Sequence, residues 1–312
     1  MNYRHAFHAG NFADVVKHAV LTRIMLHLQE KPAAFRVIDT HAGAGLYDLS
    51  GEEARRGGEW RDGIGRLLDD AGSDDAEGEA GGEAGRMPAG ELLRPYLDIV
   101  RSYNQGGDKL AAYPGSPLIA RALLRPQDRM TACELEPGAS RQLLAHLRRD
   151  AQARVVAIDG WTALTAYVPP NERRGLVLID PPFEQANEFE RMASAFDAAF
   201  AKWPTGIFAL WYPVKDVQAA GRFAQAVARS IARQYAAPAK GRASANLSEK
   251  CLRVVFRTVP EMRSAAGLVS AGLMIANPPW TLEQELRAIM PLLARRLGRE
   301  GDGRFTIDRP AA

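Results

Sequence analysis

A carboxylate, two prolines and an aromatic ring stand together at Asp180-Pro181-Pro182-Phe183. They follow the apolar run 175–179, which is too short and too β-branched to favour a helix and predicts a buried parallel strand. Because prolines end a strand and fix the backbone, the turn presents a hydrogen-bond acceptor beside a flat apolar ring. Such a pair suits a planar base with an exocyclic amino group. Alternatively, both residues have a structural role, in which Asp180 caps the next helix and Phe183 packs in the core.

Two glycines, Gly43 and Gly45, lie in the segment Asp39-Thr-His-Ala-Gly-Ala-Gly45, directly after another predicted strand. Glycine permits positive φ and lets a ligand approach the backbone closely. The segment lacks the phosphate-binding pattern of ATP enzymes, and Asp48 stands where a dinucleotide fingerprint has its last glycine. A glycine turn after a strand indicates a cofactor site only when other residues support it.

Further acids follow the ends of successive predicted strands. Glu134 stands where an acid commonly binds ribose hydroxyls, and Asp159-Gly160 is placed to accept a hydrogen bond from an adenine amino group. The distance from the glycines to Glu134 exceeds the usual ~20 residues unless 46–112 is an insertion. Since parallel strands share one carboxyl edge, Asp39 and these acids predict a ligand site there.

The elements that must position these residues alternate along the chain. Apolar periodicity separates short strands from amphipathic helices. Strands are expected at 35–39, 130–134, 154–158, 175–179, 206–211, 251–257 and 268–276, and helices at 11–31, 58–68, 90–103, 116–124, 138–150 and 188–201. This alternation predicts an α/β fold with a doubly wound, mostly parallel sheet.

Residues 46–112 interrupt the alternation. Within them, the tract 69–90 is acidic and rich in glycine, with seven acidic and no basic residues between Asp69 and Glu83. Such a composition buries little apolar surface, so we expect a flexible acidic loop inside a small inserted helical subdomain of one domain spanning 1–312. Without those seven acids the formal net charge rises from +3 to +10. That charge is compatible with a polyanionic partner, and equally with a slightly basic soluble surface.

The bulk composition excludes several classes of protein. Cys133 and Cys251 are the only cysteines, and both lie in apolar runs, so we expect reduced core thiols and no thiolate zinc site. No apolar run approaches a membrane span, and the N-terminus lacks the apolar core of a signal peptide. We therefore expect a cytoplasmic protein with no metal and no membrane contact.

The strand-end acids resemble those of class I S-adenosylmethionine-dependent methyltransferases, and Asp180-Pro-Pro-Phe183 resembles the [DNS]-P-P-[YFW] motif of their amino-methylating members. The whole chain is similar to the RlmJ family of 23S rRNA adenine-N6 methyltransferases. The segments that carry this resemblance are Tyr3-Arg-His-Ala-Phe-His-Ala-Gly-Asn11, Asp14-Val-Val-Lys-His18, Asp39-Thr-His-Ala-Gly-Ala-Gly45, Tyr113-Pro-Gly-Ser-Pro-Leu-Ile-Ala-Arg121, Leu178-Ile-Asp-Pro-Pro182, Ala209-Leu-Trp-Tyr-Pro213 and Asn277-Pro-Pro-Trp280. Two departures are Phe183, where the family usually has tyrosine, and the long acidic tract.

The resemblance implies a Rossmann-like class I methyltransferase fold with a seven-stranded sheet. It implies S-adenosylmethionine as cofactor and 23S rRNA, protein-free or in early assembly, as the partner of a monomeric RNA-binding enzyme. Catalytic roles would fall to Asp180, Pro181 and Phe183. Cofactor contacts would come from His18, His41, Gly43, Gly45, Ser116, Glu134, Asp159 and Gly160, and RNA contacts from Tyr3, His5 and Lys17.

Each carried-over role has a plainer alternative. His18 lies on an amphipathic helix and suits a hydrogen-bonded core histidine. Ser116 could cap its helix, because Pro117 follows in the first turn. Tyr3 and His5 could belong to a frayed terminus.

The expected chemistry follows from the weak nucleophilicity of an adenine amino group, whose lone pair is delocalised into the ring. The Asp180 carboxylate and the Pro181 carbonyl would accept both amino hydrogens, and Phe183 would stack on the base. The alternatives are an amino methyltransferase acting on DNA or on a protein glutamine, and a non-catalytic RNA-binding protein.

A second motif, Asn277-Pro-Pro-Trp280, could rival Asp180. We reject it because it ends the last strand, which is antiparallel in this fold class and points its carboxyl end away from the cofactor edge. We expect Trp280 to pack in the core.

Overall fold

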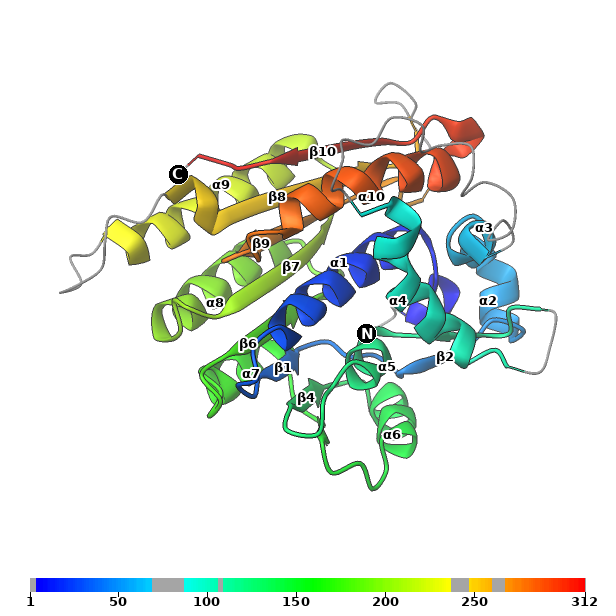
Figure 1. Cartoon of the computed structure of the whole chain (residues 1–312), viewed down its shortest axis with the longest axis horizontal. Coiled ribbons are helices and arrows are strands. Elements are labelled where there is room, and N and C mark those ends of the chain that lie inside the picture. Colours follow the sequence, from blue (N-terminus) through cyan, green and yellow to red (C-terminus); the bar gives the residue numbers. More distant parts are fainter. Residues whose placement is uncertain (1–3, 69–86, 106–108, 237–246, 260–266, 312) are drawn as a thin grey trace.

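The computed structural model describes residues 4–68, 87–105, 109–236, 247–259 and 267–311. Within them an eight-stranded sheet runs in the order β10-β8-β9-β7-β6-β1-β4-β5 (Figure 1). The strands are β1 (Arg36–Asp39), β4 (Arg129–Cys133), β5 (Ala153–Val156), β6 (Gly175–Ile179), β7 (Ile207–Pro213), β8 (Cys251–Arg257), β9 (Ser270–Ala276) and β10 (Arg304–Asp308).

The five strands from β5 to β7 pair in parallel, whereas β9 runs antiparallel to both β7 and β8. This confirms the predicted α/β fold with a mostly parallel sheet. The sheet has one strand more than the seven expected. The additional strand, β10, pairs antiparallel with β8 and was missed because its alternating pattern is short and mostly polar.

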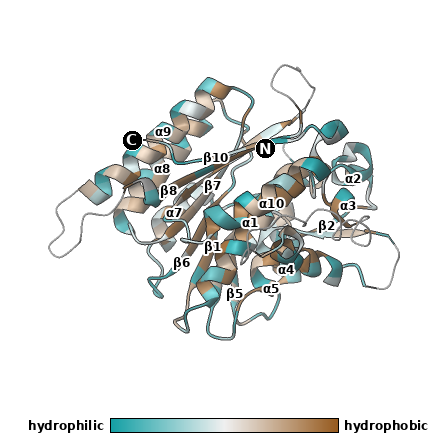
Figure 2. Cartoon of the chain, turned by 45° about the horizontal axis from the view of Figure 1, so that its top comes forward, coloured by the Kyte–Doolittle hydropathy of each residue, from teal (hydrophilic) through white to brown (hydrophobic). Residues whose placement is uncertain are grey.

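Helices cover both faces of the sheet (Figure 1), and buried apolar residues form a core cluster on each face. In Figure 2 the strands of the sheet are coloured mainly as hydrophobic residues. One face carries α1 (Phe12–Gln29), α4 (Ala89–Ser102), α5 (Ser116–Ala122), α6 (Pro137–His146) and α10 (Leu282–Leu297). The other carries α7 (Gly160–Tyr167), α8 (Glu188–Lys202) and α9 (Val217–Ala236). Of these, α7, α9 and α10 were not among the predicted helices.

Helix α1 is the element that brings charged residues to the site. Asn11 caps it as predicted, since its side chain accepts hydrogen bonds from Ala13 N and Asp14 N. The helix is buried on nearly every face because it lies between the sheet and the helices α4, α5 and α10. The buried polar residues of this helix, among them Asp14, Lys17 and His18, are therefore shielded from water and need hydrogen-bond partners within the protein.

The described part of 46–112 contains β2 (Leu46–Asp48), α2 (Glu52–Gly57), η2 (Glu59–Arg61) and α3 (Ile64–Leu68), together with α4. Strand β2 pairs antiparallel with β3 (Ala112–Pro114); neither strand was predicted, because three residues are too few for a periodic signal. Residues 69–86 of the predicted acidic loop lie outside the described residues. The subdomain and its loop therefore stay a prediction.

The second Pro-Pro motif follows β9, which runs antiparallel to β7 as expected. The Asn277 side chain donates to the carbonyls of Pro204 and Gly206, in the turn before β7. The motif is thus at the opposite edge of the sheet from Asp180. The expectation for Trp280 was wrong: this side chain is 81% exposed, because the turn directs it out of the molecule.

Candidate active site

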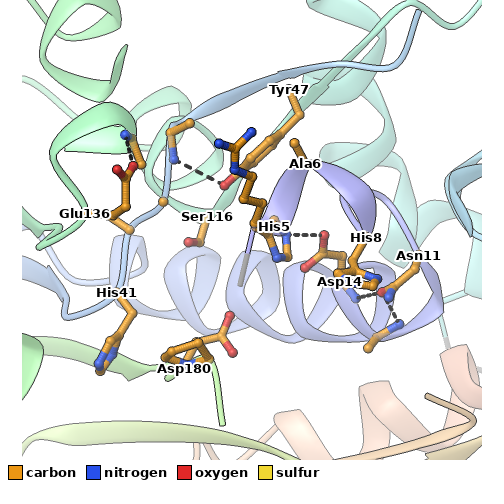
Figure 3. A pocket seen from close by; sticks show the side chains of 18 of the residues that line it. His5, Ala6, His8, Asn11, Asp14, His41, Tyr47, Ser116, Glu136 and Asp180 are labelled. Carbon is orange, nitrogen blue, oxygen red and sulfur yellow. Dashed lines mark hydrogen bonds and ion pairs between the residues drawn. The ribbon is translucent and has the colours of Figure 1, made fainter. Parts of the chain in front are cut away.

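A cavity of about 1430 Å³ opens at the carboxyl ends of β1, β4 and β6. Parallel strands end together at this edge, so residues far apart in the sequence meet there. The predicted site residues that line the cavity are His5, Lys17, His18, His41, Gly43, Ser116, Glu134, Asp180, Pro181 and Phe183. Figure 3 shows how several of their side chains converge on this space.

Asp180 follows β6 and points its carboxylate into the cavity (Figure 3). Its Oδ2 accepts a hydrogen bond from Lys17 Nζ at 2.5 Å. Among the described residues no donor contacts the other oxygen, Oδ1, which leaves that oxygen for a ligand. Asp180 does not cap the next helix, because the N-cap position of α8 belongs to Asn187.

Phe183 stands beside Asp180 with a left-handed backbone, at φ 52°. Its ring meets Phe189 and Trp211 edge to face, with centroids 5.0 and 6.1 Å away. These contacts fix the ring orientation while part of the ring lines the cavity. The turn therefore presents an acceptor next to a held aromatic surface, as its sequence predicted.

Lys17 lies in a different setting from the one expected of an RNA contact. The side chain is only 5% exposed, and Nζ lies between Asp14 Oδ1 at 2.7 Å and Asp180 Oδ2. Burial would lower the pKa of Lys17, but the two carboxylates outweigh it and raise the pKa well above its usual value. The ammonium is therefore permanently charged and already paired with two carboxylates, and the RNA contact of Lys17 stays a prediction.

His5, in the short helix η1 (His5–Phe7), hydrogen-bonds through Nε2 to Asp14 Oδ2 at 2.9 Å. Its ring also meets Tyr47 edge to face at 5.0 Å. Tyr3, the other residue expected to contact RNA, lies outside the described residues.

Glu134 joins the end of β4 to the glycine turn. Its Oε2 accepts from Gly43 N at 2.8 Å, and its Oε1 accepts from Glu136 N at 2.7 Å. Burial raises the pKa of Glu134. Glycine is required at position 43, because φ is +65° and a Cβ there would lie 2.2 Å from the Tyr47 hydroxyl.

Ser116 is not a helix cap, since Gly115 occupies that position. Its hydroxyl donates instead to Asp39 Oδ2 at 2.7 Å, which links α5 to the end of β1. Asp39 is 1% exposed, and burial raises its pKa to about 7 despite the hydrogen bond from Ser116.

Two histidines border the cavity as neutral rings. His18 Nδ1 hydrogen-bonds to the Tyr113 hydroxyl at 2.7 Å, whereas its buried Nε2 has no partner among the described residues. Burial holds the pKa of His18 well below its usual value and lowers that of His41 to about 4. Only one of the two ring nitrogens of His18 is therefore hydrogen-bonded, and His18 lines the cavity.

Gly45, Asp159 and Gly160 do not line the cavity. Asp159 caps α7, accepting from Thr162 N at 3.0 Å. Gly160 lies under the His41 ring, where a Cβ would come within 2.5 Å of His41 Cε1. Of the three, Gly160 thus supports the His41 ring from outside the cavity.

Sequence reasoning missed Asp14, which is 2% exposed and lies in the first turn of α1. The available signal was its spacing of three residues from Lys17, which places the two side chains on one face of a mostly apolar helix.

No group of three or more potential metal-ligating side chains occurs in the described ranges. Across those same ranges, no helix combines the length and apolarity that a membrane span needs.

Comparison with known proteins places this geometry in context. The family model described as ribosomal RNA large subunit methyltransferase D, RlmJ, matches residues 32–309. Ribosomal RNA large subunit methyltransferase J of Escherichia coli is 38% identical over 307 residues, covering 98% of each chain. Its counterpart from Haemophilus influenzae is 35% identical over 99% of this chain and 98% of its own. A Legionella pneumophila protein of known crystal structure superposes with a TM-score of 0.79 at 30% identity, covering 97% of this chain and 98% of that one.

Proposed function

Because this chain belongs to the RlmJ family of ribosomal RNA large subunit methyltransferases, we propose that it methylates the N6 amino group of an adenine in 23S rRNA. The cofactor of this proposal is S-adenosylmethionine. The observation that carries the proposal is Asp180, which directs an uncommitted carboxylate oxygen into the large cavity beside the Phe183 ring.

The residues of the cavity fit this cofactor. S-adenosylmethionine supplies, when bound, an electrophilic methyl group on a sulfonium cation, and it also carries ribose hydroxyls and an amino acid moiety. The half-buried Glu134 carboxylate lines the cavity and suits its hydroxyl donors. The unpaired Nε2 of His18 supplies a further polar contact that the protein itself leaves unmet. We propose that these residues, with His41 and Ser116, hold the cofactor.

Asp180 acts on the amino nitrogen. Its Oδ1 accepts one amino hydrogen, and the Pro181 carbonyl accepts the other, so the nitrogen lone pair turns toward the electrophilic carbon. The carboxylate stabilises the positive charge that grows on nitrogen and takes up the proton that nitrogen loses. Phe183 stacks on the base, which leaves its own stack to enter the cavity. This account needs no covalent enzyme intermediate.

An Asp180→Asn variant tests the assignment. Asparagine keeps the shape but donates a hydrogen bond where the mechanism needs an acceptor, so methyl transfer falls by on the order of a hundredfold or more. Transfer of labelled methyl to protein-free 23S rRNA gives the rate, and calorimetry gives the cofactor affinity, which stays close to that of the wild type.

Asn277→Ala is the control, because the second Pro-Pro motif lies at the opposite edge of the sheet. Its rate per folded molecule stays at the wild-type level, although the loss of two hydrogen bonds lowers its stability. Near-normal turnover in Asp180→Asn would remove Asp180 from the mechanism.

A further inference from the structure

One buried acid close to the site has no part in the mechanism above. Asp14 lies in the first turn of α1 and is 2% exposed. A buried carboxylate is costly unless its oxygens are hydrogen-bonded and its charge is compensated. The contacts of Asp14 therefore indicate what it does for the protein.

Each oxygen of Asp14 has defined partners. Oδ2 accepts from Gly10 N and hydrogen-bonds to His5 Nε2, both at 2.9 Å, and Oδ1 accepts from Lys17 Nζ at 2.7 Å. Burial would raise the pKa of Asp14, but the charges of His5 and Lys17 outweigh it and hold the pKa well below its usual range. Asp14 is thus a fixed anion that is anchored at both oxygens.

Lys17 connects this anion to Asp180. Its ammonium has one carboxylate on each side, with Asp14 Oδ1 at 2.7 Å and Asp180 Oδ2 at 2.5 Å. Because the ammonium is shared by two carboxylates, it does not fully neutralise Asp180, and the charge left on Asp180 favours the positive charge that grows on a substrate nitrogen. Asp14 also restrains the ammonium, because the two residues are three apart on one helix face.

From these contacts we infer that Asp14 is the positioning residue for Asp180. It holds the Lys17 ammonium on Oδ2, so that Oδ1 stays directed at the substrate amino group. Without the Asp14 charge, Asp180 becomes the sole anion of Lys17. The ammonium then shifts toward both Asp180 oxygens, and the pair becomes neutral where the reaction needs negative charge. This inference rests on the proposed function, in which Asp180 accepts the amino hydrogen.

An Asp14→Asn variant tests the inference, with kcat and KM measured on protein-free 23S rRNA. Misplacing a reacting group lowers kcat by about ten- to a hundredfold, whereas KM for the cofactor and the RNA stays within about twofold. Asp14→Glu keeps the charge but moves the carboxylate by one methylene, and its kcat lies between those of Asn and the wild type.

Asp128→Asn is the matched control. Asp128 is also buried, accepts from the backbone N–H of Phe35 and pairs with Arg125 three residues away, but it precedes β4 at the opposite edge of the sheet. Its substitution lowers the melting temperature without changing kcat of the folded enzyme.

A double-mutant cycle separates positioning from general damage. If Asp14 acts through Lys17, then Asp14→Asn has little further effect on kcat in a Lys17→Met background. Additive losses in the cycle, or a normal kcat in Asp14→Asn, overturn the inference. If Asp14→Asn does not fold, Asp14→Glu decides: a reduced kcat at constant KM supports positioning, and an unchanged kcat overturns it. A wild-type enzyme that methylates no adenine overturns the proposed function, and the inference with it.

Discussion

Replacing Asp39 with asparagine should change how the stability of this protein depends on pH. Asp39 is 1% exposed at the end of β1, and burial raises its pKa from 3.8 to about 7. Between these two values the folded protein holds a proton that the unfolded chain releases. The stabilisation from this proton is complete below the unfolded pKa and is lost as the pH rises through about 7. Asparagine does not titrate, yet it still accepts the Ser116 hydrogen bond.

The size of the effect follows from the pKa difference. From pH 5 to the folded pKa of about 7, the folded protein holds a proton that the unfolded chain has released. Over these roughly two pH units the stability falls by about 1.4 kcal/mol per unit, or about 3 kcal/mol, and above pH 7 it stays constant. For a chain of 312 residues, 1 kcal/mol corresponds to roughly 1.5 °C in melting temperature. The wild type should therefore lose about 4 °C relative to Asp39→Asn over this range.

Calorimetric melting of both proteins at pH 5, 6, 7 and 8 measures the difference directly. Subtracting one protein from the other removes the contributions of all groups that they share. Parallel pH profiles for the wild type and Asp39→Asn would refute the reasoning, since they would mean that Asp39 ionises normally in the fold.

Three further substitutions probe other parts of the account. Gly160→Ala places a Cβ 2.5 Å from His41 Cε1, so the imidazole must shift; we expect calorimetry to show cofactor affinity lower by about tenfold, and unchanged affinity would exclude His41 from binding. Trp280→Ser removes a side chain that is 81% exposed, and the melting temperature should stay within about 1 °C; a larger fall would indicate a packing role. Tyr3→Ala should reduce RNA methylation by about one to two orders of magnitude through lost base stacking, with cofactor binding intact, whereas equal damage to both would assign Tyr3 to the cofactor site.

The sequence was sufficient for seven of the eight strands of the large sheet and for the edge at which its strand-end acids lie. Strands such as β6 are short, apolar runs closed by prolines, and an acid directly after each strand must reach the carboxyl edge whatever the details of packing. For this reason the sequence alone predicts that Asp180 and Glu134 lie at the same edge of the sheet.

The sequence could not predict ion pairs between residues that lie far apart along the chain. Lys17 and Asp180 are separated by 163 residues, and no local pattern indicates that one binds the other. The RNA contact of Lys17 was implied by the family resemblance, and neither that resemblance nor the residue type indicated that the ammonium is buried between two carboxylates. The prediction that Trp280 packs in the core was wrong, because an apolar residue type does not reveal which way a tight turn directs the side chain.

The central claim is that this protein transfers methyl groups to an adenine amino nitrogen of 23S rRNA. The most direct test incubates the pure protein with protein-free 23S rRNA and methyl-labelled S-adenosylmethionine, then digests the RNA to nucleosides. The account predicts that the label appears in N6-methyladenosine, and that Asp180→Asn lowers its rate of appearance by on the order of a hundredfold or more. Label in another nucleoside, or no label in the RNA while the protein binds the cofactor, would contradict the account.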